Sequence, residues 1–231
     1  MSRARALGVF AATLLVMLVL LCPLGAGVAL TGLGQLGLSA RAATGTMWSG
    51  SLADARLGPV PLGDVDVALR PLPLLAGRIE LGVTGVSGTG RLIASSGSLG
   101  IGKVTAKLSL AQAFAPLPLD LIDLDEVTVR FVGLRCDSAE GRVRATFTGD
   151  VGGLDLSSGL SGAARCDGGE LLLPLASQSG TQRLSLHVAG DGGWRAVLTV
   201  RVADPAMAEK LAAAGFRAIA GGYVLRLSGK V

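Results

Sequence analysis

Apolar and polar side chains alternate along most of the chain beyond residue 60. A period of two is typical of β-strands that bury one face, because successive side chains point to opposite sides of a strand. The clearest runs are Asp64–Arg70, Arg78–Thr84, Lys103–Leu110, Glu126–Phe131, Arg142–Phe147, Trp194–Val202 and Tyr223–Ser228. Glycine-rich stretches at 85–90, 149–153 and 190–193 separate these runs at distances typical of hairpins. We therefore predict a mainly β, antiparallel fold.

The predicted sheet has one apolar face, and about ten such strands cannot stay flat and open in water. The face must be covered by folding the sheet over, by a second sheet or by another molecule. We expect a strongly curved or folded-over sheet. Whether its apolar face is an ordinary core or a groove shaped for lipid is left open by the pattern.

One segment near the C-terminus has the signals of a short helix. Asp204 is a good N-cap, Pro205 fits the first helical position, and an alanine-rich stretch follows. Gly215 could end the helix. The residues expected on its apolar stripe are Met207, Leu211 and Ala214.

The N-terminus has the pattern of a membrane anchor. Arg3 and Arg5 precede a stretch without charge that runs to Ala40, and Ala6–Leu21 is almost wholly apolar. A bilayer-spanning helix needs about 20 residues, so a helix from Ala6 to about Val28 suffices. The arginines before it predict a cytoplasmic N-terminus and an exported C-terminal part.

Two other interpretations of this segment stay open. A cleaved signal peptide would use Gly27–Ala29 as its processing site, although the apolar run is long for one. A lipoprotein would use Cys22, whose neighbours Leu21 and Pro23 make a poor site. All three interpretations deliver the rest of the chain across the membrane. We divide the chain into residues 1–40, a cytoplasmic arm and transmembrane anchor, and residues 41–231, a periplasmic β-domain that could form two lobes joining near 115–120.

The composition narrows the function classes. Half of the 231 residues are hydrophobic but only 3% are aromatic, and the formal charge is +4. The basic residues are scattered, whereas a nucleic-acid interface concentrates cations and interleaves aromatic side chains. We therefore predict no nucleic-acid partner and interpret the charges as solvated strand faces, with a weak attraction to anionic lipid as the alternative.

Two cysteines lie in the predicted exported part. Cys136 and Cys166 are most simply a disulfide in an oxidising compartment. A closed loop of about 30 residues stabilises a fold by roughly 3–4 kcal/mol on the chain-entropy model. Asp137 and Asp167 beside them are a poor ligand set for a soft metal. We predict no metal site and no cofactor.

No set of residues predicts catalysis. His187, the one histidine, lies opposite the apolar residues of its strand and is expected to be solvated. Four carboxylates crowd one short stretch, Asp120, Asp123, Asp125 and Glu126. They lack the glycine-containing loop of an EF-hand, so a turn and a charged strand are the simpler interpretation. Ser49 lies outside any G-x-S-x-G element.

Several short motifs carry a family resemblance. They are GTMWSG at Gly45–Gly50, VALRPLPLLAGRIEL at Val67–Leu81 and the closing GGYVLRLSGKV at Gly221–Val231. With the spaced pair Cys136 and Cys166, they resemble protein N of the general (type II) secretion pathway of Gram-negative bacteria. The resemblance runs from residue 40 to the end. Leu69–Pro71 departs from the pattern, because the strand lacks the aromatic residue expected before the proline.

The resemblance implies a non-enzymatic, single-pass accessory component of the inner membrane, which contacts other inner-membrane and periplasmic subunits of the secretion machinery. It implies no catalytic residues. The motif residues that become candidates for partner contact are Gly45, Thr46, Trp48, Gly50, Pro71, Gly77 and Tyr223. The chain also has no G-x-x-x-x-G-K-[ST] loop of its own to supply the energy for transport.

A looser similarity links this family to AsmA-like, β-groove proteins associated with lipid movement between membranes. It implies a half-barrel type of sheet. It also supplies the alternative function, a lipid-binding or lipid-transfer module of the cell envelope. An exported hydrolase is the third and least supported hypothesis.

Overall fold

The structure is a computed structural model of the chain. It describes residues 38–110, 114, 119–147, 150–151, 154–156, 158–202 and 204–230, with Phe10, Thr13, Leu14, Met17, Leu21 and Pro23 before them.

The fold is dominated by one 16-stranded antiparallel sheet. Its strands are β1 (Leu38–Ser39), β2 (Ala42–Thr46), β3 (Ser49–Leu57), β4 (Val60–Leu69), β5 (Arg78–Gly85), β6 (Gly88–Ser95), β7 (Ser98–Ser109), β8 (Leu119–Val132), β9 (Arg135–Phe147), β12 (Leu160–Ala163), β13 (Arg165–Asp167), β14 (Glu170–Ala176), β15 (Gln182–Val188), β16 (Gly193–Val200), β17 (Arg217–Ile219) and β18 (Gly222–Lys230). Two short strands, β10 (Asp150–Val151) and β11 (Leu154–Asp155), pair separately. The helices are α3 (Pro71–Leu74) and α4 (Pro205–Ala213).

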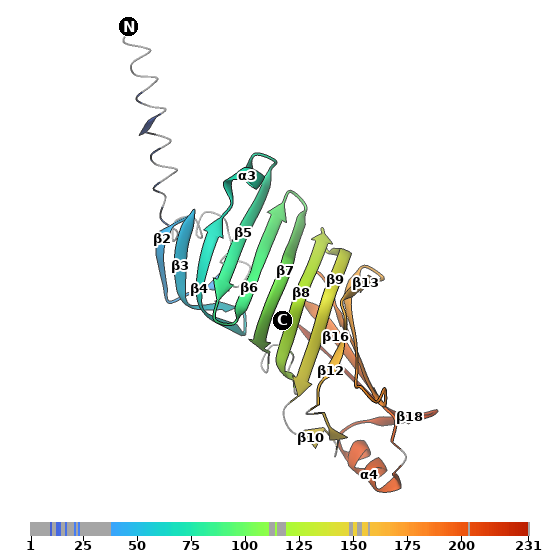
Figure 1. The fold of residues 1–231 in the computed structure, drawn as a ribbon. Coiled ribbons are helices and arrows are strands. Elements are labelled where there is room, and N and C mark those ends of the chain that lie inside the picture. The colour runs from blue at the N-terminus through green and yellow to red at the C-terminus, as the bar shows by residue number, and fades with distance from the viewer. Residues whose placement is uncertain are drawn as a thin grey trace.

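The strand order follows the sequence closely. It runs β1-β3-β4-β5-β6-β7-β8-β9-β12-β14-β15-β16-β18-β17, with β2 beside β3 and β13 beside β14. In Figure 1, β2 to β9 form a broad layer, and the later strands turn back behind its β8–β9 part. The sheet does not close. One edge is formed by β17, and the other by β1 and β2, which both pair with β3. The predicted mainly β, antiparallel fold is confirmed.

The main core lies where the sheet doubles back on itself. Leu184, Leu186 and Leu198 are each at most 2% exposed, and they pack with residues of β8 and β9 in one buried cluster. Leu211 of α4 is fully buried in the same cluster. The helix therefore forms where the sequence predicts it. Its apolar stripe differs from the prediction at Ala214, which is exposed, whereas Phe216 beyond the helix is buried.

The N-terminal half of the sheet is covered less completely. A small cluster of Leu52, Ala55, Val65 and Val67 is buried on β3 and β4. In β5 and β6 no residue is fully buried, although β5 alternates apolar and polar residues regularly. The apolar face of this half is thus partly open to solvent.

One disulfide ties the two layers together. Cys136 of β9 is bonded to Cys166 of β13, the pairing expected from the sequence, with 5.6 Å between the Cα atoms. The Cys136 N–H also donates a hydrogen bond to the Gly169 carbonyl oxygen at 2.7 Å. The two contacts hold the start of β9 against the β13–β14 hairpin.

Most of the predicted anchor, Ala6 to about Val28, lies outside the described residues. Among the residues that are described, no helix is both long and apolar enough to cross a bilayer. Pro23 forms an isolated antiparallel bridge with Thr46 at the end of β2. The proposed lobe boundary at 115–120 falls largely outside the described residues too, while β7 and β8 on either side of it pair along their length.

Candidate functional site

The GTMWSG motif forms the tight hairpin between β2 and β3. Gly45 and Gly50 are direct cross-strand partners. Gly45 has a φ of 90°, and a Cβ atom at this position would lie 2.7 Å from the Gly50 Cα atom. Only glycine satisfies both the backbone angle and the close approach. The motif thus has a structural reason that is independent of any ligand.

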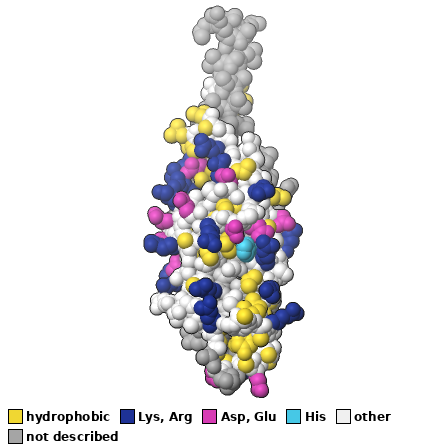
Figure 2. All heavy atoms as spheres, turned by 90° about the vertical axis from the view of Figure 1, so that its right-hand side faces the viewer, with side chains coloured by type: hydrophobic (Ala, Val, Ile, Leu, Met, Phe, Trp, Pro, Cys, Tyr) yellow, Lys and Arg dark blue, Asp and Glu magenta, His cyan; other side chains and the backbone are white. Residues whose placement is uncertain are grey.

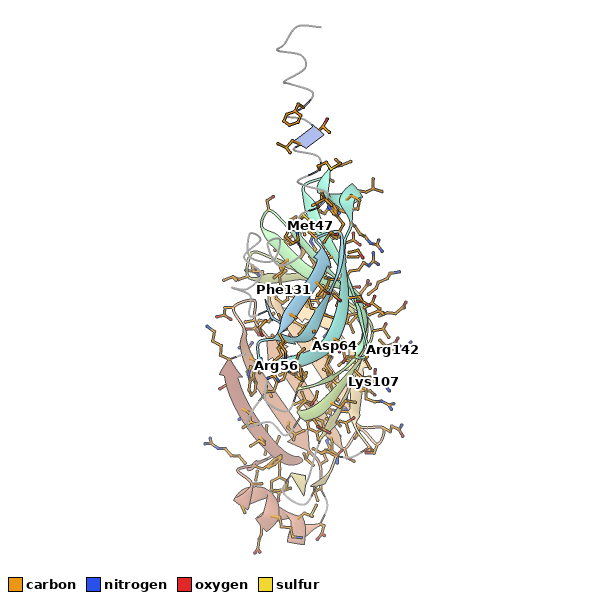
Figure 3. The ribbon with its side chains drawn as sticks, turned by 90° about the vertical axis from the view of Figure 1, so that its left-hand side faces the viewer. Met47, Arg56, Asp64, Lys107, Phe131 and Arg142 are labelled. Carbon is orange, nitrogen blue, oxygen red and sulfur yellow. A yellow bond between two sulfur atoms is a disulfide. The ribbon has the colours of Figure 1, made fainter. Side chains whose placement is uncertain are left out.

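The four-residue turn of this hairpin is closed by a hydroxyl group. The Ser49 N–H donates to Thr46 Oγ1 at 3.4 Å, and the Thr46 hydroxyl donates to the Ser49 carbonyl oxygen at 3.5 Å. Met47 and Trp48 occupy the tip and are half-buried. Figure 3 shows Met47 in the upper part of the sheet and Arg56, at the other end of β3, well below it.

A helix of four residues, α3, joins β4 to β5. Pro71 takes the first helical position, where a missing N–H costs nothing. Gly77 ends the connection with a φ of 67°, and its N–H donates to the Leu74 carbonyl oxygen at 3.0 Å. Leu72 and Leu75 on α3 and its C-cap are 78% and 88% exposed. This helix was not predicted from the sequence, because four residues are too few to show a helical period.

The Glu80 carboxylate forms ion pairs that join the two ends of this connection. Glu80 Oε1 lies 3.4 Å from Arg70 Nη1 and 3.2 Å from Arg91 Nη1. The Arg70 N–H donates to the Glu80 backbone carbonyl oxygen at 2.9 Å. The Glu80 side chain is only 16% exposed, so its charge is shared by two guanidinium groups in a partly desolvated place. Glu80 was not predicted as a site residue from the sequence.

The register brings the hairpin and α3 to the same end of the sheet. Gly50 pairs with Val67, and two residues later Leu69 pairs with Leu81. Six of the seven motif residues are therefore gathered there: Gly45, Thr46, Trp48, Gly50, Pro71 and Gly77. Tyr223 is not among them, because it lies in β18 next to Val200 of β16, near the other edge of the sheet.

The carboxylate cluster of the sequence lies within β8 and makes cross-strand ion pairs. Asp125 Oδ2 is 3.0 Å from Arg142 Nη2, and Asp123 Oδ2 is 3.8 Å from Lys107 Nζ. Glu126 has a φ of 52° at a β-bulge, where its N–H donates to Thr105 Oγ1. Among the described residues no three His, Cys, Asp or Glu side chains are arranged to hold a metal ion.

His187 is less solvated than the sequence predicts. It lies on the outer face of β15 as expected, but its side chain is only 20% exposed. Its Nδ1 atom is 3.3 Å from Glu170 Oε2, which also binds Arg195 Nη2 at 2.6 Å. The side chain is therefore half-buried beside the Glu170 carboxylate, and Arg195 is its direct cross-strand neighbour on β16.

The described residues thus form a wide, unclosed antiparallel sheet with a disulfide and a glycine-constrained hairpin. Comparison with known families gives the particular family. Residues 36–226 match the family described as Type II secretion system (T2SS), protein N, and the chain belongs to it. No curated protein matches the chain significantly, and no solved structure does.

Proposed function

We propose that this chain is a non-enzymatic accessory component of the type II secretion machinery, held at the inner membrane with its β-domain in the periplasm. The observation that carries the proposal is the family match over residues 36–226, which spans nearly the whole β-sheet. Family membership implies association with other components of that machinery and with the cell envelope.

The disulfide supports the periplasmic location. Disulfides persist in oxidising compartments such as the periplasm and are rare in the cytosol. Cys136 and Cys166 are bonded in this chain and are 30 residues apart in sequence.

The membrane anchor in this proposal is shorter than the sequence alone suggests. Because Pro23 is bridged to Thr46 of the sheet, an anchoring helix must end before residue 23. Residues 6–22 would form a helix of about 25 Å at 1.5 Å per residue, the lower limit for crossing the hydrocarbon core. Arg3 and Arg5 would then lie on the cytoplasmic side.

We assign partner contact to the hairpin end of the sheet. Tryptophan is enriched among the residues that dominate binding energy at interfaces, and Trp48 lies with Met47 at the tip of a rigid turn. The turn is fixed by the Gly45–Gly50 contact and by the Thr46 hydroxyl, so little conformational entropy is lost when a partner binds.

Crosslinking in cells tests this assignment. A photoreactive residue at Met47 in the full chain should yield adducts with secretion subunits, whereas one at Val86, in the β5–β6 turn at the other end of the sheet, should not. Deleting the chain should reduce secretion of folded exoproteins. Normal secretion without the chain, together with no Met47 adducts, would refute the proposal.

A second candidate function, lipid binding or transfer, is favoured by the partly exposed apolar face of β5 to β7. Leu81, Leu92 and Ile101 are cross-strand neighbours on this face, and all three are only half-buried. A photoreactive residue at Leu92 should then form phospholipid adducts in cells. The same residue at Ile93, which points to the opposite face, is the matched control. Equal labelling at both positions contradicts a lipid groove.

A further inference from the structure

Exposed apolar side chains are concentrated at one end of the N-terminal layer. Leu72 and Leu75 extend from α3, and Leu134 in the β8–β9 turn is 66% exposed. Other large hydrophobic residues with high exposure at this end are Ile79, Leu99 and Val132. Figure 2 shows hydrophobic side chains at the upper end of the described body. Such grouping is unusual on a surface that only water contacts.

A continuous cross-strand row brings these residues together. Arg78 pairs with Ser95, and Ser95 pairs with Ser98 across the β6–β7 turn. Ser98 pairs with Val132, which pairs with Arg135 across the next turn. The Gly133 N–H donates to the Gly97 carbonyl oxygen at 2.7 Å, so the two turns are joined directly. We name residues 70–79, 95–99 and 130–135 the α3 rim.

The charges of the α3 rim have one sign. Its only ionisable side chains are Arg70, Arg78, Arg130 and Arg135, and its three segments contain no Asp or Glu. Arg70 forms an ion pair with Glu80, which also binds Arg91, and Arg130 lies 3.8 Å from Asp137. No ion pair joins Arg78 or Arg135 to a carboxylate within the described part of the chain. The surface therefore combines apolar side chains with uncompensated positive charge.

The backbone of α3 is suited to apolar surroundings. Pro71 and Pro73 have no N–H group, and the N–H groups of Leu75, Ala76 and Gly77 are all bonded within the segment. Unbonded backbone groups are costly where water is scarce, so the two prolines and these three bonds lower the cost of placing α3 in a lipid interface.

Pro23, just beyond the apolar N-terminal run, contacts the sheet at this same end. Pro23 is bridged to Thr46, at the turn that the register places beside the end of β4. Leu21, the last residue of the run, is two residues from Pro23, a distance of at most about 7 Å. Thr46 is two strand positions from β4, or about 10 Å. A bilayer that holds residues 6–21 therefore lies next to α3.

We propose that the α3 rim is a second membrane contact, which rests on the anionic surface of the bilayer that holds the N-terminal run. Leu72 and Leu75 enter the boundary between headgroups and acyl chains, and Arg78 binds lipid phosphates. Together with the anchor, this contact fixes the orientation of the sheet on the membrane. The inference assumes that the N-terminal run lies in a bilayer, but it does not depend on a role in secretion.

Fluorescence quenching by lipid tests the contact. The full chain carrying Leu75→Trp is reconstituted in vesicles of phosphatidylcholine and phosphatidylglycerol with brominated acyl chains. The emission added by the new tryptophan, over that of the unmodified chain with Trp48 and Trp194, should be blue-shifted and quenched. Val86→Trp, at a position 99% exposed in the turn at the far end of β5, should add unquenched emission.

Leu72→Trp gives a second reporter, and both leucines are exposed enough that neither change affects folding. Unquenched emission from both rim reporters would overturn the proposal and leave a protein partner as the occupant of the rim. Equal quenching at Leu75 and Val86 would overturn it as well, because the α3 rim would then be no closer to the membrane than the opposite end of β5.

The charge of the rim is tested in the Leu75→Trp chain. Arg78→Gln should lower the ratio of quenched to unquenched emission by roughly fivefold, the contribution of one basic residue near an anionic surface. Arg56→Gln, at the far end of β3, should leave this ratio unchanged. Quenching that is equal without phosphatidylglycerol and unaffected by Arg78→Gln would refute the phosphate contact. A chain that passes these tests but crosslinks to no secretion subunit refutes only the proposed function.

Discussion

Gly45 faces Gly50 across the β2–β3 hairpin, and the space between their backbones does not admit a methyl group. The two glycines bracket Met47 and Trp48, so the close approach determines where the tip of the hairpin lies. Substitutions at this contact measure how much the close approach of the two backbones contributes to the stability of the fold.

Gly45→Ala should lower the free energy of unfolding by about 2–3 kcal/mol, because a side chain is disfavoured at a φ of 90° and the new methyl group clashes with Gly50. Gly58→Ala is the matched control: its φ is also positive, at 56°, but nothing lies within 4 Å of the new Cβ atom. We expect about 1 kcal/mol for the control. Urea unfolding of both variants measures the difference, and equal losses would show that the close approach is unimportant.

Reducing the Cys136–Cys166 disulfide should destabilise the folded chain by about 3–4 kcal/mol, since it releases a loop with a sequence separation of 30. Unfolding curves with and without a thiol reductant give this value. The Cys136→Ala, Cys166→Ala double variant should match the reduced chain and no longer respond to reductant. An unchanged midpoint on reduction would contradict the stabilising role.

Leu211→Ala should cost about 2–5 kcal/mol, because this side chain of α4 is completely buried in the main core and its removal leaves a cavity. Leu72→Ala removes the same atoms from an exposed position and should change the free energy of unfolding by less than about 0.5 kcal/mol. Thermal unfolding compares the two variants. Similar losses would mean that α4 does not pack on the sheet.

Glu80→Gln should loosen the β4–β5 connection, because the carboxylate that Arg70 and Arg91 share becomes neutral. We expect a loss of about 1–2 kcal/mol, with faster hydrogen exchange at the amides of Leu75, Ala76 and Gly77. Asp123→Asn removes the partner of the exposed Lys107 at 3.8 Å and should have little effect. Unchanged hydrogen exchange at these amides in Glu80→Gln would show that the Glu80 ion pairs do not stabilise the connection.

The strands were predictable from the sequence because alternation depends only on strand geometry. The runs around Val65, Ile79 and Val127 all became strands, and the capping residues Asp204 and Pro205 marked the start of α4 correctly. What covers each face was not predictable. Ile79 and Val127 belong to equally regular runs, yet Val127 is buried in the main core and Ile79 is exposed. The difference arises from the later strands, which turn back over β8 and not over β5.

The candidate site was predictable only in part. The motif residues Gly45 and Gly50 were singled out without the reason for them, which is a backbone contact that spacing cannot show. The environment of His187 was missed because Glu170 and Arg195 reach it across neighbouring strands. The helix α3 gave one usable signal, an apolar run between two arginines that lacks the polar alternation of the flanking strands.

The sequential strand order has a consequence for assembly. Because nearly every strand pairs with its predecessor, the sheet can grow hairpin by hairpin from its N-terminal strands onward. Beyond β3, pairing between strands that are not consecutive in the sequence is first needed when β12 pairs with β9. The Cys136–Cys166 disulfide then forms late, because it can form only after the returning layer has joined the first nine strands.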